Sequence, residues 1–433
     1  MRARRFPAAD EACGWTALLP PLPAARRLHG DQRADCAVIG AGFTGLATAR
    51  RLATLRPAWR IALLDAQRVG GGASGRNSGF VVDLPHYLPA RGVDGNARLL
   101  RLGRAGLARL RELVTAHRID CDWTERGRLH GAATDVGMRA LETFFSGADA
   151  LGEPYERLDR NGVAAITGST YYWAGARTPG SAMVQPAALA RGLARALPHN
   201  VDLFEDSAVG AIGSANGFTL DTETGHLRAD RLFVATNGFT PRLGLLRDRV
   251  FPLLTFGSLT RPLAPAEAVA LGGEPLWGLV SETPMGTTLR RLPDGRLLVR
   301  NTVRYRPALR GDAALDRRVR QLHRRAFRAR FPMLEAVDFE YTWGGVMGVT
   351  FNGAQFFGEL ESNLFVSAAY NGVGIAMGTI AGELLADLAL GADSPLLADM
   401  RALPAPDWIP PEPALGIGIR ATLAYRSRQA AGE

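Results

Sequence analysis

Residues 36–47, CAVIGAGFTGLA, constrain the fold more than any other part of the chain. An apolar run leads into Gly40-x-Gly42-x-x-Gly45, and residues that favour helices follow. In such a pattern the first glycine permits a tight turn, the second lets a diphosphate approach the backbone, and the third lets the helix pack on the strand. Free N–H groups at the start of the helix attract phosphate. We therefore expect a strand, a turn and a helix that bind a dinucleotide.

A second apolar run, RIALLD, ends at Asp65, twenty residues after Gly45. A carboxylate at the end of the next strand can accept hydrogen bonds from a ribose diol. The glycines, the helix and this acid together predict a cofactor with an ADP half. They do not distinguish NAD from FAD, because both cofactors contain that half.

Other elements follow from apolar periodicity and turn residues. Helical patterns occupy residues 96–117, 138–150 and the segment QPAALARGLARAL, where Pro186 suits a first turn. TTLRRLPDGRLLVRNTVRY predicts a hairpin around residues 293–295. Near the C-terminus a strand, NLFVSAAY, precedes a turn, NGVG, and a helix, IAMGTIAGELLADLAL. Residues 1–32 are rich in Pro, Ala and Arg, so we expect a surface arm there.

The net charge of +9 raises the question of an anionic partner. The chain contains no lysine, so arginine supplies all 51 basic side chains. In the densest run, DRRVRQLHRRAFRARFP, the apolar residues Val319, Leu322, Ala326 and Phe327 fall at helical spacing and leave the arginines on the solvated side. We therefore do not expect a nucleic-acid partner. The missing lysine also excludes a Schiff-base lysine and a Walker A lysine.

Three cysteines, Cys13, Cys36 and Cys121, form no CxxC pair, so neither a disulfide framework nor a metal site is expected. No apolar run approaches the ~18–20 residues of a membrane helix, so we expect no membrane span. The N-terminus lacks the apolar segment of a secretory signal. A cytoplasmic location is the expectation.

The segment after the second strand, GGGASGRNSGF, resembles the glycine/D-amino-acid oxidase-like (DAO) family of flavoproteins, and in particular its branch similar to γ-glutamylputrescine oxidase. Further stretches resemble the same family in order and spacing: PPLP before the first strand, RLFVATNGF, FPMLEAVDFEYTWGGVMGVTFNGAQFFGE and AAYNGVGIAMGTIAGELLAD. The resemblance implies FAD as cofactor. Some relatives tether FAD to a cysteine in the C-terminal half, but the last cysteine here is Cys121, so we expect noncovalent FAD.

The resemblance also implies which residues contact the cofactor. Flexible backbone and small hydrogen-bond donors suit a diphosphate and a ring edge. The predicted cofactor-binding residues are Gly40, Gly42, Phe43, Thr44, Gly45, Asp65, Ala66, Gly72, Ala73, Ser74, Arg76, Asn77, Ser78, Gly79, Val209, Thr236, Asn237, Gly372, Val373, Gly374 and Ile375.

The implied fold is α/β, with α and β elements mixed. A Rossmann-like FAD-binding domain would be assembled from residues 33–96, 181–245 and 343–405. A substrate-binding domain on a mixed or antiparallel sheet would comprise residues 97–180 and 246–342. Residues 1–32 form the arm in this division, and residues 406–433 form a C-terminal tail.

The implied activity is oxidation of the C–N bond of a small amine or amino acid. Hydride passes to flavin N5, and water hydrolyses the resulting imine. The turn that opens the last predicted helix would place N–H groups beside the N1/O2 edge of the reduced flavin. Some relatives activate oxygen with a lysine that this chain lacks, so the electron acceptor is oxygen or another molecule.

Two departures from the family bear on the substrate. The second strand of the hairpin carries Arg300, Asn301 and Arg304, where the branch tends to have small residues. Period-two alternation puts Arg300, Thr302 and Arg304 on one face, and if that face looks onto the flavin the arginines would hold carboxylates. This would favour an amino acid or imino diacid. If the face looks outward, the arginines are only solvated charges.

The second departure is Asn352 and Gln355 in TFNGAQFFGE, where the family often has Asp and Pro. The substrate-binding candidates are Arg300, Asn301, Arg304, Gln355 and Tyr370. Five aromatic residues could also line the pocket, although core packing is the commoner role of such residues: Tyr171, Tyr172, Trp173, Trp277 and Tyr305.

Three other functions remain open at this point. A flavoprotein could act on an aminomethyl group of RNA, an NAD-dependent dehydrogenase could use the same glycine turn, and a flavin-binding protein could lack turnover. Oligomeric state is not indicated by the sequence.

Overall fold

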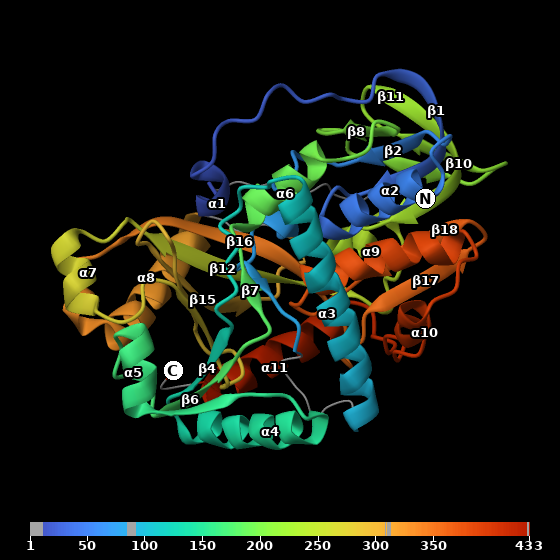
Figure 1. Cartoon of the computed structure of the whole chain (residues 1–433). Coiled ribbons are helices and arrows are strands. Elements are labelled where there is room, and N and C mark those ends of the chain that lie inside the picture. The colour runs from blue at the N-terminus through green and yellow to red at the C-terminus, as the bar shows by residue number, and fades with distance from the viewer. Residues whose placement is uncertain (1–11, 85–91, 308, 310–312, 431–432) are drawn as a thin grey trace.

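The computed structural model describes residues 12–84, 92–307, 309, 313–430 and 433. Within these residues the strands form two eight-stranded sheets and one two-stranded ladder. Figure 1 shows the two large sheets side by side, with helices packed against both.

The first sheet has the order β17-β18-β11-β1-β2-β8, and β10 and β9 extend it from β11. Strands β18, β11, β1, β2 and β8 run parallel, whereas β17, β10 and β9 pair in the antiparallel sense. The strands are β1 (Gly30–Ile39), β2 (Ile61–Leu64), β8 (Val201–Phe204), β9 (Ala211–Gly213), β10 (Phe218–Asp221), β11 (Gly225–Val234), β17 (Phe356–Glu361) and β18 (Leu364–Ala368).

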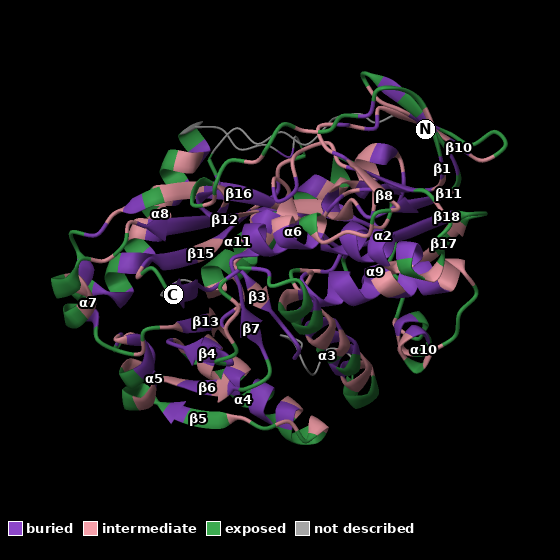
Figure 2. Cartoon of the chain, turned by 45° about the horizontal axis from the view of Figure 1, so that its top comes forward, coloured by how far each residue is buried: buried purple, intermediate pink, exposed green. Residues whose placement is uncertain are grey.

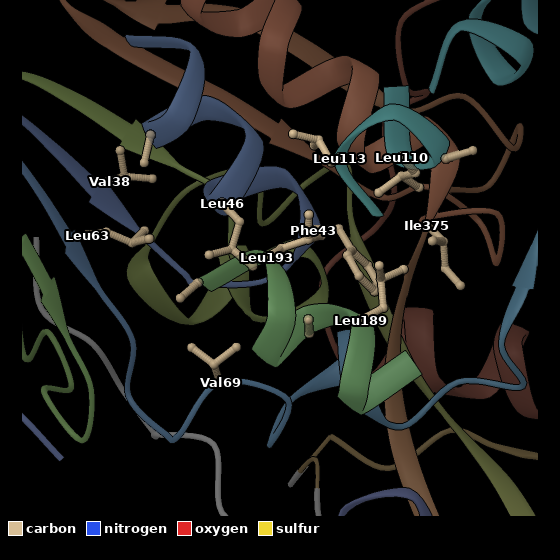
Figure 3. Close-up of a cluster of buried hydrophobic side chains, with 14 of the residues drawn as sticks. Val38, Phe43, Leu46, Leu63, Val69, Leu110, Leu113, Leu189, Leu193 and Ile375 are labelled. Atoms are coloured by element: carbon tan, nitrogen blue, oxygen red, sulfur yellow. The ribbon is translucent and has the colours of Figure 1, made fainter. Parts of the chain in front are cut away.

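Four helices belong to the core of this first sheet: α2 (Phe43–Leu55), α3 (Gly92–Ala116), α6 (Pro186–Arg195) and α9 (Ala376–Ala389). Figure 3 shows part of that core, in which Val38 and Leu63 of the strands share a cluster with Leu46, Leu110 and Leu193 of three helices. A buried side chain of this size contributes roughly 1.5–3 kcal/mol. The core therefore joins segments from the beginning, middle and end of the chain.

The second sheet has the order β16-β12-β15-β14-β13-β4-β6-β5 and is antiparallel except for the parallel pair β13–β4. The hairpin β14–β15 turns at residues 293–295, as predicted. The strands are β4 (Arg128–Ala132), β5 (Glu156–Asp159), β6 (Ala174–Thr178), β12 (Phe251–Thr260), β13 (Trp277–Ser281), β14 (Thr288–Arg291), β15 (Leu297–Arg304) and β16 (Phe339–Val349).

Among the remaining elements, α10 (Pro395–Arg401) packs against α3 and α9 beside the first sheet, and the others cover the second sheet or connect the two sheets. These others are α1 (Gly14–Ala17), α4 (Asp135–Leu151), α5 (Arg160–Thr167), α7 (Pro265–Leu271), α8 (Ala313–Arg330), α11 (Ala414–Gln429), the 3-10 helices Ala73–Gly75, Asn237–Leu243 and Pro332–Leu334, and the ladder of β3 (Phe80–Val81) with β7 (Ala182–Met183). The predicted fold class is confirmed: a mainly parallel α/β sheet and a second, mainly antiparallel sheet.

The two sheets divide the chain in a way that cuts across sequence order. Strand β16 spans the expected boundary at residues 342 and 343, and all of it lies in the second sheet. Helix α3 begins within the expected cofactor segment, and its residues Leu107, Leu110 and Leu113 pack in the core of the first sheet. Figure 2 shows that buried residues occur in both large sheets.

Two expectations about exposure need correction. Part of the expected surface arm is internal, because Trp15 is fully buried and lies edge-on against Trp343 of β16. In the arginine-rich helix α8, Val319 and Phe327 are buried as predicted, but Arg330 is also fully buried. Its Nη2 pairs with the Glu433 carboxylate at 3.2 Å, and its Nε donates to the Tyr172 hydroxyl at 3.1 Å. Buried partners therefore compensate the charge that we expected in solvent.

Within the described part of the chain, no helix is both long enough and apolar enough to span a bilayer.

Candidate active site

The turn between β1 and α2 has the close backbone approaches that the glycine pattern predicts. Gly40 has φ of +103°, and a Cβ there would lie 2.7 Å from the Ala235 carbonyl oxygen. A Cβ on Gly45 would lie 1.7 Å from the Gly40 carbonyl oxygen. Gly42 precedes the first turn of α2, whose N–H groups and positive dipole end therefore face the space over the turn. This is an anion-binding geometry.

Asp65 lies directly after β2, beside this turn. Its carboxylate accepts hydrogen bonds from the backbone N–H of Ala41 at 2.7 Å and of Gln67 at 2.8 Å. Burial raises the pKa of Asp65 to about 6, although these two N–H groups act in the opposite direction. Each oxygen keeps a further lone pair, so the carboxylate can still accept hydrogen bonds from a diol.

Residues 70–79 form a loop that is fastened at several points. Ser74 Oγ accepts from the Phe43 N–H at 3.1 Å, which joins the loop to the start of α2. Arg76 donates to the carbonyl oxygens of Gly71 and Gly344, both at 2.8 Å. Asn77 Nδ2 donates to the Ser74 carbonyl at 2.8 Å. The side chains of Arg76 and Asn77 thus shape the loop and connect it to β16.

A second glycine turn, residues 369–375, precedes α9. Asn371 has φ of +51° and Gly372 of +97°, and the Asn371 Oδ1 accepts from the Thr350 N–H at 3.0 Å. This turn meets the first, because Thr44 Oγ1 of α2 donates to the Tyr370 hydroxyl at 2.8 Å. Burial raises the pKa of Tyr370 to about 12. Two glycine turns that are more than 300 residues apart in the sequence therefore border the same space.

That space is a cavity of about 1380 Å³, larger than the roughly 300–1,000 Å³ of ordinary small-molecule pockets. Both glycine turns, the loop 70–79, the second sheet and α11 contribute to its wall. Most of the predicted cofactor residues border it: Gly40, Gly42, Phe43, Thr44, Asp65, Ala66, Gly72, Ala73, Ser74, Arg76, Asn77, Ser78, Val209, Thr236, Asn237, Gly372, Val373, Gly374 and Ile375.

Two predicted cofactor residues do not border the cavity. Gly45 lies beneath the first turn, where its missing side chain allows the close packing described above. Gly79 has φ of +75°, and a Cβ there would lie 2.1 Å from Nη1 of Arg290. Both glycines are required by backbone packing.

The family model of the DAO FAD-dependent oxidoreductases matches residues 35–388, which include both glycine turns. The chain belongs to this family. It is 28% identical over 394 residues to the oxidoreductase OrdL of Rhizobium meliloti, covering 88% of this chain and 89% of the relative. It is also 28% identical over 365 residues to γ-glutamylputrescine oxidoreductase of Escherichia coli, covering 82% and 84%.

Among solved structures, the glycine oxidase of Geobacillus kaustophilus has a similar fold, with a TM-score of 0.71. It is 24% identical and the match covers 84% of this chain and 96% of that one. As a member of this family, the chain is an FAD-dependent oxidoreductase.

The residues present fit FAD. Gly42 offers a backbone without a side chain and Ser74 a small hydroxyl, and both suit a diphosphate. Asp65 offers an acceptor for the ribose. The space beside Gly42 leaves no room for a side chain, since a Cβ there would lie 2.7 Å from Ser74 Oγ. This close approach supports the same conclusion. All three cysteines are buried, and none borders the cavity. FAD is therefore held without a cysteine linkage.

The predicted substrate residues do not all lie together. Arg300, Gln355 and Tyr370 border the cavity, whereas Asn301 and Arg304 do not. The Gln355 amide donates to the Met400 sulfur at 2.7 Å. Asn301 Nδ2 donates to Thr287 Oγ1 at 3.3 Å.

The predicted alternation of Arg300, Thr302 and Arg304 on one face is wrong. The register of β15 against β12 shifts between Phe256 and Gly257, so that Phe256 pairs with Thr302 and Gly257 with Arg300. This β-bulge places one extra residue in β15 and resets its alternation. Arg300 therefore shares the cavity wall with Val303, while Arg304 pairs with Leu254, which packs against α8.

The candidate aromatic residues are not in the cavity wall. Tyr172, Trp277 and Tyr305 are buried, and Trp173 is 43% exposed. Sequence reasoning missed Glu282, Met347 and α11, all of which border the cavity. The family stretch around residue 347 was a usable signal for Met347. Nothing local in the sequence indicated that α11 folds back over the cavity.

Proposed function

We propose that this enzyme oxidises the C–N bond of a small amine that also carries a carboxylate, such as an amino acid or an N-substituted amino acid. FAD, when bound, accepts the hydride from the carbon beside the nitrogen, and water then hydrolyses the imine product to a carbonyl compound and an amine. The proposal depends on one observation: Arg300 is on the cavity wall, whereas Arg304, four residues later, is not.

The chemistry of Arg300 supports this substrate class. A guanidinium presents a planar pair of donors that matches a carboxylate. The strand that carries it is central in the second sheet, between β12 and β14, so the backbone at Arg300 is held on both sides. Glycine, after which the similar glycine oxidase is named, also has a carboxylate beside its amine.

Residues around the two glycine turns suit the remaining demands of the reaction. The turn before α9 presents backbone N–H groups and the start of a helix, which stabilise negative charge that develops nearby. An amine that binds in its neutral form requires no protein base at the reacting carbon.

The experiment is an anaerobic screen of primary amines, secondary amines, D- and L-amino acids and imino diacids for loss of the oxidised-flavin absorbance. The best substrate is then compared with its decarboxylated analogue in the parent, in Arg300→Ala and in Arg304→Ala. We expect Arg300→Ala to raise KM for the carboxylate substrate about 10- to 100-fold, since a charge-assisted hydrogen bond contributes about 1.5–3 kcal/mol. Arg304→Ala should change it less than about 3-fold.

An Arg300→Ala variant that binds the carboxylate substrate as well as the parent would remove the carboxylate proposal. A parent that no amine or amino acid reduces would remove the proposed reaction itself. An oxygen-electrode trace of the same turnover distinguishes an oxidase from a dehydrogenase that uses another acceptor.

A further inference from the structure

The cavity has an acidic end that the proposed reaction does not use. Glu282 follows β13, and its N–H donates to the Gly131 carbonyl of β4 at 2.9 Å. Its carboxylate borders the cavity with 9% of the side chain exposed. Asp83 borders the same cavity and accepts a hydrogen bond from Ser181 Oγ at 2.9 Å.

Glu282 is held in place from behind by His130. Glu282 Oε1 lies 2.6 Å from His130 Nδ1, and the His130 ring is fully buried and stacked on Phe144 with centroids 4.2 Å apart. Arg128 Nε donates to His130 Nε2 at 3.3 Å. Because Nε2 accepts that hydrogen bond, the proton of a neutral imidazole lies on Nδ1 and is donated to Glu282.

Burial and the neighbouring Arg128 lower the pKa of His130, which agrees with a neutral ring. A neutral His130 positions the Glu282 carboxylate without cancelling its charge. Within the described ranges, the second carboxylate oxygen of Glu282, Oε2, accepts no hydrogen bond. Oε2 is also not completely enclosed by the protein. This oxygen is therefore available to a ligand in the cavity.

Among the described residues at this end, the charges do not balance. Arg128 is fully buried, and the carboxylates of Asp83 and Glu282 both act on it electrostatically. One guanidinium facing two carboxylates leaves one negative charge, and neutral His130 adds none. A positively charged group in the cavity would supply the missing compensation.

The acidic end lies away from Arg300. Strand β14 separates β15, which carries Arg300, from β13, which leads to Glu282. Two strand spacings correspond to roughly 10 Å. A substrate that reaches both ends must therefore be longer than a two-carbon amino acid.

We propose that Glu282, positioned by His130, binds a second, cationic nitrogen of the substrate, remote from the C–N bond that is oxidised. The substrate class is then a diamino acid, whose carboxylate suits Arg300 and whose second ammonium suits Glu282. This inference rests on the proposed function and extends it from one amine nitrogen to two.

The test uses pairs of ligands that differ by one ammonium group: butylamine with 1,4-diaminobutane, and 2-aminopentanoate with 2,5-diaminopentanoate. Dissociation constants come from the change in the flavin spectrum of the anaerobic holoenzyme, and kcat and KM from turnover. We expect the parent to bind the diamino member of a pair at least about 10-fold more tightly, as a charge-assisted hydrogen bond implies. Glu282→Gln should reduce this preference to less than about 3-fold, because the amide lacks the charge that pairs with the second ammonium.

Glu361→Gln, which alters an exposed carboxylate on β17, is the matched control and should keep the parent preference. His130→Gln should raise KM for the diamino ligand alone while kcat changes little, whereas a purely structural role would alter both members of a pair alike. If Glu282→Gln does not retain FAD, the inference is decided by the preference for the diamino member of each pair, measured in the parent and in Glu282→Asp.

Equal binding of both members by the parent overturns the inference, as does an equal effect of Glu282→Gln on both. Neither result touches the proposed function, provided that the amines still reduce the flavin. If no compound of the anaerobic screen reduces it, the proposed function fails, and the spectral titration still reports whether Glu282 selects the second ammonium.

Discussion

At the scale of single residues, the environment decides what a side chain does. Asp65 was predicted from its distance to Gly45, but only the structure shows that two backbone N–H groups hold its carboxylate while burial raises its pKa to about 6. Arg330 belongs to an arginine-rich run that looks solvated, and it is fully buried beside Glu433. Neither environment follows from neighbouring residues in the sequence.

Asp65 leads to a pH-dependent prediction. Its ordinary pKa is 3.8, so between about pH 4 and pH 6 the folded FAD-free protein binds a proton that the unfolded chain has released. The free energy of unfolding should therefore fall as pH rises through this window, by up to roughly 2–3 kcal/mol from this group. Asp65→Asn should remove that slope. Denaturant unfolding of the FAD-free proteins at pH 4 to 6.5 measures it.

Asp31→Asn, at an exposed position at the other end of β1, serves as the control and should retain the slope. Asp65→Asn should also weaken FAD binding by about 10-fold, because an amide replaces a charged acceptor. Identical pH profiles in the parent and Asp65→Asn would contradict the account of this carboxyl group.

At the scale of elements, the glycine turn and the β15 bulge show the two limits of sequence reasoning. The strand, turn and helix around Gly40, Gly42 and Gly45 were predictable because their spacing is a local steric requirement. The bulge in β15 was not predictable, because it arises from pairing with β12, more than 40 residues earlier in the chain. A single extra residue separated Arg300 from Arg304 and decided which of them reaches the cavity.

A pair of glycine substitutions tests the steric account of the turn. Gly45→Ala should open the β1–α2 turn, since its Cβ would lie 1.7 Å from a carbonyl oxygen, and should abolish FAD retention. Gly418→Ala in α11 meets nothing within 4 Å and should stabilise the protein by about 0.5–1 kcal/mol through helix propensity. FAD content after desalting and the free energy of unfolding provide the readouts. A Gly45→Ala enzyme with full FAD would refute the close packing.

At the scale of the whole molecule, one cavity joins three distant parts of the chain. The first glycine turn, the second glycine turn and α11 all border it, although they begin near residues 40, 370 and 414. The second sheet supplies the opposite wall through β12, β15 and β16. FAD bound in this space would lie between residues of both sheets and would stabilise their association.

Removal of FAD should lower the thermal midpoint of the whole protein in one transition. A ligand at 100 times its Kd stabilises the folded state by about 2.7 kcal/mol, which corresponds to a shift of a few degrees in a chain of this length. Scanning calorimetry of the protein with FAD removed and then restored in increasing amounts measures the shift. A midpoint that does not depend on FAD concentration would contradict this prediction.

The family, the cofactor and the first glycine turn follow from the amino-acid sequence, because they depend on local steric rules and on motifs that keep their order along the chain. The main hairpin and most helices also follow from it, since apolar periodicity is local. The folded chain was needed to show which arginine reaches the cavity, that Glu282 and His130 form its acidic end, and that α11 borders it. These features depend on strand register and on contacts between residues distant in sequence, and no local pattern encodes them.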